Sequence, residues 1–402
     1  MRILFCNYEY PPLGGGGGVV MAALARHLAK RHEVTVLTSR AGDLPSESVE
    51  DGVRVLRVPV FFRRQLAVAN FPSMFAYLPS GFLRALAVRR RMRFDVINTH
   101  FVVPTGPLGH ALARVLGIPN VLSVHGGDLF DPSKKSSPHR HAPMRAAVRA
   151  LLNAADAVVG QSQDTVRHVE TLYGVRRHVE LIPLGIERPT AAAAETIPAL
   201  RASFGLPENA FVLVTIGRLV ARKATSRLVD ILAATRLPDT HLLIVGSGPD
   251  SAAIADRART LGLSDRVHLL GQLSEERKYA ALRAADVFVS TSQHEGFGLV
   301  FLEAMAFGLP VVCYDRGGQT DFLSSGETGF TLPLNDEIAF KDALLALHSD
   351  PAARRRQGTG NLERVEQFFI DTCAARYEQI FEGVVAKSVR SPHARTPVSS
   401  SS

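Results

Sequence analysis

The chain has 402 residues, of which 46% are hydrophobic and 21% charged, and 46 basic residues against 38 acidic ones give it a net charge of +8. This length accommodates two or three domains with cores of their own, and the composition excludes a disordered chain. The three cysteines lie far apart in sequence, which argues against a disulfide framework or a zinc site and is typical of a reducing compartment.

Helix and strand patterns alternate through the first half of the chain. Apolar runs short enough for buried strands lie at residues 3–6, 33–38, 95–99, 120–124, 157–159 and 179–182. Apolar residues at helical spacing lie between them, at residues 19–30, 108–116, 144–153 and 166–172. Buried strands separated by helices predict a parallel sheet that is covered on both faces.

The alternation stops at residues 187–198, which contain two prolines and no strand pattern and are typical of a linker. It then resumes, with strands at 211–216, 242–245, 267–270, 287–289 and 310–313 and helices at 228–234, 252–261, 279–284 and 299–306. Helical patterns also fill residues 336–385.

We therefore predict an α/β protein of two doubly wound, Rossmann-like domains with parallel sheets that face each other across a cleft. The first domain takes residues 1–187 and the second takes residues 188–370. A helix at 371–387 is expected to pack back on the first domain, and a serine-rich tail at 388–402 is expected to be disordered.

The sequence predicts no membrane span. The longest apolar stretch, residues 297–314, is interrupted by Glu303 and Pro310. The first twelve residues carry one arginine and too short an apolar core for a secretory signal, so we expect a cytoplasmic protein. Its positive charge suits an anionic substrate, an anionic lipid or nucleic acid and does not choose among them.

Five consecutive glycines, Gly14 to Gly18, separate the first predicted strand from the first predicted helix. Glycines at this place allow backbone amides to approach an anion at the positive end of a helix dipole. The dinucleotide fingerprint G-x-G-x-x-G/A fails in every register, the acidic residue expected after the second strand is missing, and no Gly-Lys pair forms a P-loop. A flexible glycine turn is the alternative interpretation.

Two histidines end predicted strands: His100 in the sequence Asn98-Thr99-His100, and His125 before a pair of glycines. A histidine at the carboxyl end of a strand can reach a ligand in a cleft, and the glycines favour this interpretation for His125. The alternative is a polar loop residue bonded to nearby backbone, and for His100 the two interpretations are equally good.

Charged side chains follow the strands of the second predicted domain. Arg218 follows its first strand and Lys223 opens the next helix, where a guanidinium and an ammonium can clamp a diphosphate. Glu295 lies in a loop and Glu303 early in the helix after it, where amides can bind phosphate and carboxylates can accept hydrogen bonds from hydroxyls. Together these four side chains favour a binding site for a sugar linked to a diphosphate. The alternative is that the cations lie at a solvated helix start and Glu295 in a surface loop. No Asp-x-Asp metal motif occurs, so we expect the protein to supply the positive charge that a diphosphate leaving group requires.

Over residues 1–377 the sequence resembles the retaining, nucleotide-sugar-dependent glycosyltransferases of family 4, which have the two-domain GT-B fold. Several motifs occur in the family's order. They are Pro11-Pro12 before the glycines, Pro104 after His100, His125-Gly126, Ile182-Pro183-Leu184-Gly185, Gly217-Arg218-Leu219 with Lys223, Gly246-Ser247-Gly248-Pro249, and the pair Glu295 and Glu303 with seven residues between them. The set is specific for the family and not for a donor or an acceptor.

The resemblance implies a donor site in the second domain, in which Arg218 and Lys223 bind the diphosphate and Glu303 binds the ribose hydroxyls. Glu295 would hold the transferred sugar. Backbone amides beside it would assist, namely those of Phe297, Gly298 and Leu299. In this family retention is attributed to attack on the same face of the sugar, and the leaving phosphate helps to deprotonate the acceptor. A covalent nucleophile, a metal and a cofactor are then not expected.

Three further glycines and one histidine have roles by the same resemblance. Gly16 or Gly17 would approach the phosphate of the sugar, His125 would lie close to the reacting sugar, and the loop at Gly271 would meet the base. Two residues depart from the family pattern: Ala224 stands where a glycine is usual after the lysine, and Leu184 where an asparagine is common. A methyl group at position 224 is harmless in a helix but crowds a backbone approach to phosphate.

The acceptor side is less defined, and one basic segment stands out. Residues 60–94 contain seven arginines and no acidic residue, together with many aromatic and aliphatic side chains. The arginines are Arg63, Arg64, Arg84, Arg89, Arg90, Arg91 and Arg93. Such a segment suits a membrane surface and a lipid-linked acceptor, and a buried helix with a solvated basic end is an equally good interpretation. Nucleic acid is not expected, because no stacking platform or binding motif occurs.

The sequence thus predicts a retaining glycosyltransferase that moves a sugar from a nucleotide-diphosphate donor to a hydroxyl of a saccharide or lipid-linked acceptor. Polysaccharide, lipopolysaccharide or glycolipid synthesis at the inner face of the plasma membrane would be its setting. Two alternatives come from other classes: a nicotinamide-dependent oxidoreductase, which the broken fingerprint disfavours, and a non-catalytic protein that binds sugar nucleotides.

Overall fold

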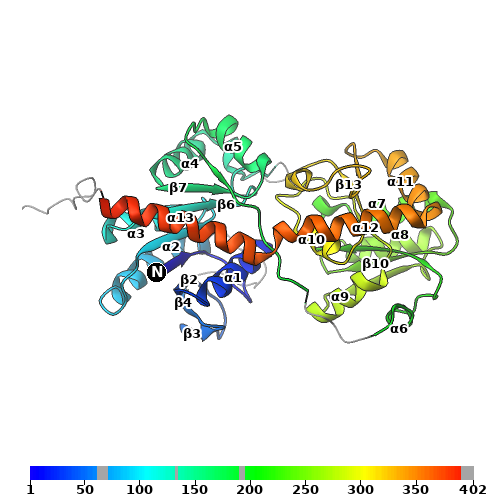
Figure 1. Ribbon diagram of the computed structural model, residues 1–402, viewed down its shortest axis with the longest axis horizontal. Helices are drawn as coiled ribbons and strands as arrows, with labels where there is room; N and C mark the ends of the chain where they lie inside the picture. The colour runs from blue at the N-terminus through cyan, green and yellow to red at the C-terminus, as the bar shows by residue number, and fades with distance from the viewer. Residues whose placement is uncertain (61–70, 132–134, 190–194, 391–402) are drawn as a thin grey trace, which may run out of the picture. The chain divides into compact units, whose positions relative to one another are not determined.

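The computed structural model describes residues 1–60, 71–131, 135–189 and 195–390, and it divides into two compact units (Figure 1). The first unit contains Met1–Ile186 together with the C-terminal helix, and the second contains Glu187–Phe369. Each unit is built around its own sheet. Three predicted segments lie partly outside the described residues. They are the basic segment at 61–70, the linker at 190–194 and the tail at 391–402.

The first unit has an eight-stranded sheet in the order β3-β4-β2-β1-β5-β6-β7-β8. The strands are β1 (Arg2–Cys6), β2 (Glu33–Arg40), β3 (Glu47–Glu50), β4 (Val53–Pro59), β5 (Val96–His100), β6 (Asn120–Val124), β7 (Ala157–Gly160) and β8 (Glu180–Leu181). All neighbouring pairs are parallel except β3 with β4. The order reverses between β1 and β5, and at such a point the loops after the strands leave room for a ligand.

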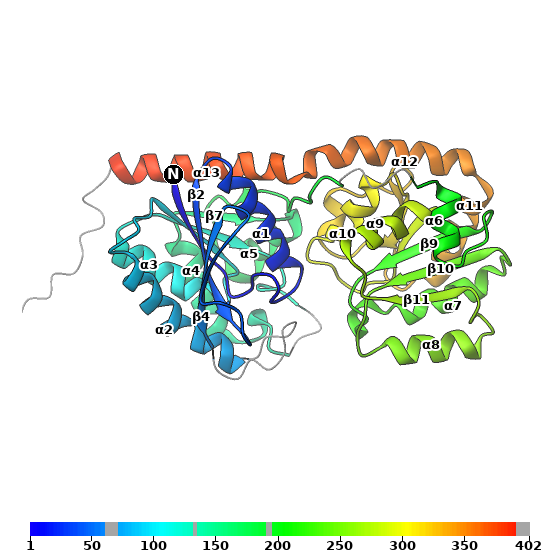
Figure 2. The same ribbon diagram turned by 90° about the horizontal axis from the view of Figure 1, so that it is seen from below.

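Helices cover both faces of this sheet, because successive residues of each buried strand point to opposite sides. The helices are α1 (Gly16–Ala29), α2 (Phe71–Val88), α3 (Gly106–Leu116), α4 (Ala142–Ala154), α5 (Gln163–Tyr173) and α13 (Ile370–Arg390). On one face, Ile3 and Phe5 pack with α1 and α13, while Leu4 and Cys6 on the other face pack with α2 and α3. Figure 2 shows α13, in red, on the side of the sheet opposite to α2 and α3.

The second unit has a six-stranded, fully parallel sheet in the order β11-β10-β9-β12-β13-β14. Its strands are β9 (Phe211–Ile216), β10 (Thr240–Val245), β11 (Val267–Gly271), β12 (Val287–Ser290), β13 (Val311–Tyr314) and β14 (Gly329–Leu332). Its helices are α6 (Ile197–Ser203), α7 (Ser226–Thr235), α8 (Ser251–Thr260), α9 (Glu275–Ala284), α10 (Leu299–Ala306), α11 (Glu337–Ser349) and α12 (Pro351–Val365). Helices α7, α8 and α11 share one apolar core with the sheet. The predicted α/β class with two Rossmann-like parallel sheets is confirmed.

Several elements differ from the sequence prediction. The hairpin of β3 and β4 and the strand β14 were not predicted, and α6 begins inside the predicted linker. The first helix begins at Gly16 and not at residue 19, so Gly16 and Gly17 lie in its first turn, where helix geometry provides no intrahelical acceptor for the backbone amides. Within the described residues, no helix is both long and apolar enough to cross a bilayer.

Candidate functional site

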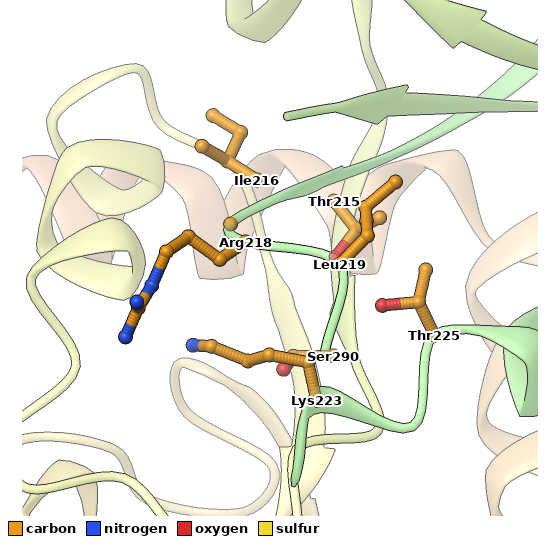
Figure 3. Close-up of a pocket in the computed structure, with 8 residues that line it drawn as sticks. Thr215, Ile216, Arg218, Leu219, Lys223, Thr225 and Ser290 are labelled. Carbon is orange, nitrogen blue, oxygen red and sulfur yellow. The ribbon is translucent and has the colours of Figure 1, made fainter. Parts of the chain in front are cut away.

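A small pocket lies at the carboxyl end of β9 in the second unit (Figure 3). Its lining residues come from the end of β9 and the loop after it, from the 3-10 turn η2 (Ala221–Lys223), from the residue before α7 and from β12. They are Thr215, Ile216, Gly217, Arg218, Leu219, Lys223, Thr225 and Ser290. The cationic ends of Arg218 and Lys223 point to the same side of the pocket. Two cations at the end of one strand can hold an anion with more than one negative charge.

Glu295 joins this pocket through an ion pair with Lys223. The Glu295 side chain is buried, its Oε1 contacts Lys223 Nζ, and Arg222 Nη1 lies 3.7 Å from its Oε2. Hydrogen bonds in both directions hold the Glu295 backbone, because its N–H donates to the Arg316 carbonyl at 3.1 Å and its carbonyl accepts from Gly318 N–H at 3.0 Å. The loops that follow β12 and β13 therefore fix this carboxylate in place.

The charges around Glu295 determine its protonation. Burial by itself would raise the pKa of the Glu295 carboxyl, but the neighbouring charges of Lys223 and Arg222 and the hydrogen bond from Lys223 outweigh it and lower the pKa below its ordinary value. The carboxylate is therefore ionised at neutral pH and neutralises Lys223 while no anionic ligand is bound.

The residues after Glu295 form the start of α10. Gly298 is the N-cap with φ of 92°, and an added Cβ would lie 2.4 Å from the Phe301 ring. The Phe297 side chain is buried against Phe322 and Phe368, so it packs the core and leaves only its backbone for a ligand. Leu299 is the first helical residue, and amides at this position have no partner within the helix.

Glu303 lies on α10 and pairs with a neighbouring helix. Its Oε1 accepts from Lys278 Nζ of α9 at 3.0 Å, whereas its buried Oε2 has no hydrogen-bond partner among the described residues. Burial raises the pKa of the Glu303 carboxyl, although Lys278 acts in the opposite direction. Gly271 ends β11 with φ of 66°, and its carbonyl accepts from the Gly246 N–H at 2.7 Å.

In the first unit, the predicted glycines and His125 meet at one phenylalanine. Phe101, which follows β5 with φ of 68°, stacks on the His125 ring with centroids 4.0 Å apart. A Cβ added to Gly17 would lie 2.4 Å from the Phe101 ring, so only glycine allows this approach. The glycine turn also has a partner that the sequence did not indicate, because the Glu9 carboxylate accepts from the Gly15 N–H at 3.1 Å.

His125 and His100 hydrogen-bond to each other and not simply to nearby backbone. His100 Nδ1 and His125 Nε2 are 2.9 Å apart, and both rings are buried. Burial lowers the pKa of the His125 imidazole to about 3, and burial together with His125 lowers the pKa of His100 well below its ordinary value. Both rings are therefore neutral at physiological pH.

Two family models match the sequence, one in each half of the chain. The family "Glycosyltransferase Family 4" matches residues 14–188, and "Glycosyl transferases group 1" matches residues 196–364. A D-inositol 3-phosphate glycosyltransferase of Kineococcus radiotolerans is 31% identical over 381 residues, which cover 88% of this chain and 87% of that protein. The chain belongs to glycosyltransferase family 4. The predicted family and enzyme class are thus confirmed.

Other proteins are also similar to this glycosyltransferase. An N-acetyl-alpha-D-glucosaminyl L-malate synthase of Bacillus anthracis is 27% identical over 390 residues, with 94% of this chain and 96% of that protein covered. Among solved structures, a sucrose-phosphate synthase of Thermosynechococcus elongatus superposes with a TM-score of 0.80 at 24% identity, covering 96% of this chain and 99% of that one. The fold of this glycosyltransferase is therefore of the GT-B type.

Within this family 4 enzyme, the structure brings together Arg218, Lys223 and Glu295, whereas Glu303 pairs with Lys278 of α9. The role of Lys278 was not predicted, because nothing in the local sequence links this residue to a carboxylate 25 residues later. Arg222 was not predicted either, although this residue stands beside Lys223. No group of three or more histidine, cysteine, aspartate or glutamate side chains suitable for a metal occurs in the described part of the chain.

Proposed function

We propose that this glycosyltransferase is a retaining enzyme that transfers a hexose-type sugar from a nucleoside diphosphate to a hydroxyl group. The observation that carries the proposal is the pocket lined by Arg218 and Lys223, with the Lys223 charge balanced by Glu295. A diphosphate that enters this pocket gains two cations, and it competes with Glu295 for the ammonium group. No residue acts as a covalent nucleophile, and neither a metal nor a cofactor takes part.

In this proposal the diphosphate lies against Arg218 and Lys223. The bond between the anomeric carbon and the phosphate oxygen breaks, and the acceptor oxygen forms a bond to the same face of that carbon. The acceptor proton passes to the leaving phosphate, so that atoms and charges balance. Positive charge near the leaving oxygen stabilises the negative charge that develops there.

Each remaining predicted residue has a part in substrate binding. The unpartnered Oε2 of Glu303 accepts a hydrogen bond from a ribose hydroxyl, since a buried acceptor without a partner is costly in the free enzyme. Glu295 and the amides at the start of α10 hold the sugar, and the backbone at Gly271 meets the base. In the first unit, Gly16 or Gly17 approaches the phosphate and His125 lies beside the sugar.

The donor is tested by thermal denaturation with uridine, guanosine and adenosine diphosphates, because a ligand that binds only the folded protein raises its melting temperature. We expect one of the three to stabilise the wild type and to have little effect on Arg218→Ala. Transfer with the matching sugar nucleotide should give a product of unchanged anomeric configuration, and it should persist in excess chelator. Inversion of configuration would refute the mechanism, and wild-type transfer rates in Arg218→Ala would refute the site.

We further propose that the acceptor is a saccharide or lipid-linked hydroxyl presented at an anionic membrane surface. The outward side of α2 exposes Phe75 and Leu83, which are 67% and 66% accessible. Four exposed arginines follow the helix within one short segment, namely Arg89, Arg90, Arg91 and Arg93. Exposed apolar side chains next to exposed arginines suit the boundary between lipid headgroups and acyl chains. Arg63 and Arg64 lie outside the described residues, and Arg84 pairs with Glu47 at 2.9 Å.

Vesicle flotation tests this surface. We expect the protein to float with vesicles that contain phosphatidylglycerol and not with pure phosphatidylcholine, and the variant Phe75→Ser/Leu83→Ser should lose this binding. The matched control is Ile338→Ser, because Ile338 is 71% exposed on the second unit and should leave binding unchanged. Equal binding of the double variant and the control would refute the membrane proposal.

The named relatives favour a second candidate acceptor. Their names specify D-inositol 3-phosphate and L-malate, which are small, anionic compounds that carry hydroxyls. The net charge of +8 suits such an acceptor as well. Product formation with D-inositol 3-phosphate or L-malate in the absence of lipid would favour this candidate over a membrane-bound acceptor.

A further inference from the structure

Three buried side chains form a chain of hydrogen bonds at the carboxyl ends of β5 and β6. Asn98 Oδ1 lies 2.7 Å from His100 Nε2, and His100 Nδ1 lies 2.9 Å from His125 Nε2. Asn98 and His100 are at most 1% exposed, and His125 is 8% exposed. Water therefore has little access to these three side chains, and their contacts within the protein determine which nitrogen atoms carry protons.

The position of every proton in the chain follows from one backbone carbonyl. Asn98 Nδ2 lies 3.0 Å from the Val121 carbonyl oxygen, which can only accept, so the nitrogen of the amide must face it and Oδ1 must face His100. His100 Nε2 then carries a proton and donates it to Asn98. A neutral His100 has a lone pair at Nδ1, and His125 Nε2 must donate to it. The neutral His125 ring is therefore left with a lone pair at Nδ1.

The lone pair on His125 Nδ1 is the last acceptor in this series of hydrogen bonds. His125 Nδ1 is buried and has no hydrogen-bond partner among the described residues, although the ring is stacked on Phe101 and its backbone N–H is bonded to Asp128 Oδ1 at 2.9 Å. A buried acceptor without a partner costs free energy in the unliganded protein. A ligand group that donates a hydrogen bond to this nitrogen would recover that cost.

We infer that Asn98 and His100 are positioning residues which hold His125 as the Nε2–H tautomer, so that its Nδ1 accepts a hydrogen bond from a substrate hydroxyl. The inference rests on the proposed function, in which His125 lies beside the reacting sugar. It adds a chemical restriction. His125 does not act as a cation toward phosphate or as a donor to a carboxylate, because a neutral ring with an unprotonated Nδ1 repels both groups.

The tautomer is measured directly on the full-length protein labelled with ¹⁵N-histidine. Long-range ¹H–¹⁵N correlation spectra distinguish protonated from unprotonated ring nitrogens, and the variants His100→Gln and His125→Gln assign the two rings among the 14 histidines. At neutral pH we expect both rings to be protonated at Nε2 and unprotonated at Nδ1. A proton on His125 Nδ1, alone or in an imidazolium ion, would overturn the inference.

Two buried variants then separate positioning from simple structural support. Asn98→Leu keeps the approximate volume of the side chain and removes the acceptor for His100. Ser123→Ala removes hydrogen bonds from Asn98 at 2.9 Å and from Tyr377 at 3.1 Å, but the Val121 carbonyl still fixes the amide. We expect Asn98→Leu to populate the other His125 tautomer and to lower kcat/KM about tenfold or more, while Ser123→Ala changes neither beyond about twofold.

The outcomes of these measurements distinguish the inference from the function on which it rests. If wild-type protein transfers no sugar but shows the expected tautomers, the proposed function fails while the proton arrangement stands. If transfer occurs and Asn98→Leu loses no more activity than Ser123→Ala at a similar loss of melting temperature, the positioning role is refuted.

Discussion

Replacing Glu295 with glutamine tests how much the central ion pair contributes to the stability of the second unit. The substitution keeps the shape of the side chain and removes its charge, so that Lys223 loses its counter-ion. The Glu295 and Lys223 side chains are 8% and 17% exposed. Breaking a fully buried pair costs about 3–5 kcal/mol. Because Lys223 still reaches water in part, we expect a smaller cost of about 1–3 kcal/mol, or a fall in melting temperature of about 2–12 °C for a unit of this size.

The measurement is unfolding by heat and by urea, followed by circular dichroism, with the transition of the second unit analysed by itself because two units need not unfold together. The matched control is Glu337→Gln. Glu337 pairs with Arg227 at 3.2 Å, but both side chains are well exposed, at 45% and 37%, so its loss should cost less than about 0.5 kcal/mol. Equal losses in the two variants would contradict the argument that burial makes the Lys223–Glu295 pair important.

The same pair predicts a pH dependence of stability. Lys223 and Arg222 lower the pKa of Glu295 below its ordinary value of 4.5 against the opposing effect of burial. The folded state therefore releases this proton more readily than the unfolded state, and the resulting stability is present above pH 4.5 and is lost as the pH falls through the lower folded pKa. In Glu295→Gln this acid-dependent contribution should be absent from a urea-unfolding series, and an unchanged pH profile would contradict the assignment.

Three further substitutions test local features of the two units. Ala224 has φ of 46°, a left-handed conformation that costs a non-glycine residue about 1–2 kcal/mol. Ala224→Gly should remove this cost, but glycine also makes the unfolded chain more flexible. We therefore expect a net gain in stability of up to about 1 kcal/mol in urea unfolding. Gly298→Ala should lower stability by about 1–3 kcal/mol, since φ is 92° and the new Cβ would meet the Phe301 ring at 2.4 Å. Unchanged stability would show that the start of α10 can shift. The pKa of His125 in the folded protein is about 3 against an ordinary 6.5, so the unfolded state binds a proton that the folded state does not, and stability falls as the pH drops below 6.5. His125→Gln should reduce the loss of stability between about pH 7.5 and about pH 5. An equal loss of stability in wild type and variant would refute this assignment.

The effect of the alanine at position 224 depends on its backbone conformation, which the sequence does not reveal. The sequence marks Ala224 as unusual for the family, and a helical backbone at this position would make the methyl group harmless. The structure gives it a left-handed backbone at the end of η2, and its carbonyl accepts from Thr291 Oγ1 at 2.9 Å. The departure is therefore a local strain beside the pocket and not an obstacle to the fold.

The sequence by itself determined the α/β class, the two repeating halves and the family, because these depend on local periodicity and on short motifs. Buried strands must be apolar and helices must keep one apolar side, whatever lies next to them. The loops after β9 and β12 were found in the same way, since Arg218 and Glu295 follow the ends of apolar strands by two and five residues. Strand β3 was not predicted because an exposed edge strand such as Glu47–Glu50 lacks this apolar signal, and in β4 two arginines, Arg54 and Arg57, interrupt the apolar run.

Only the tertiary structure decided which side chains meet. Lys223 and Glu295 are 72 residues apart in sequence, and Asn98, His100 and His125 become one hydrogen-bonded chain because β5 and β6 are neighbours in register. Helix α13 packs against α1 through a core that joins the two ends of the chain. Contacts of this kind depend on strand order and on the three-dimensional placement of charges, and local sequence patterns carry no information about either.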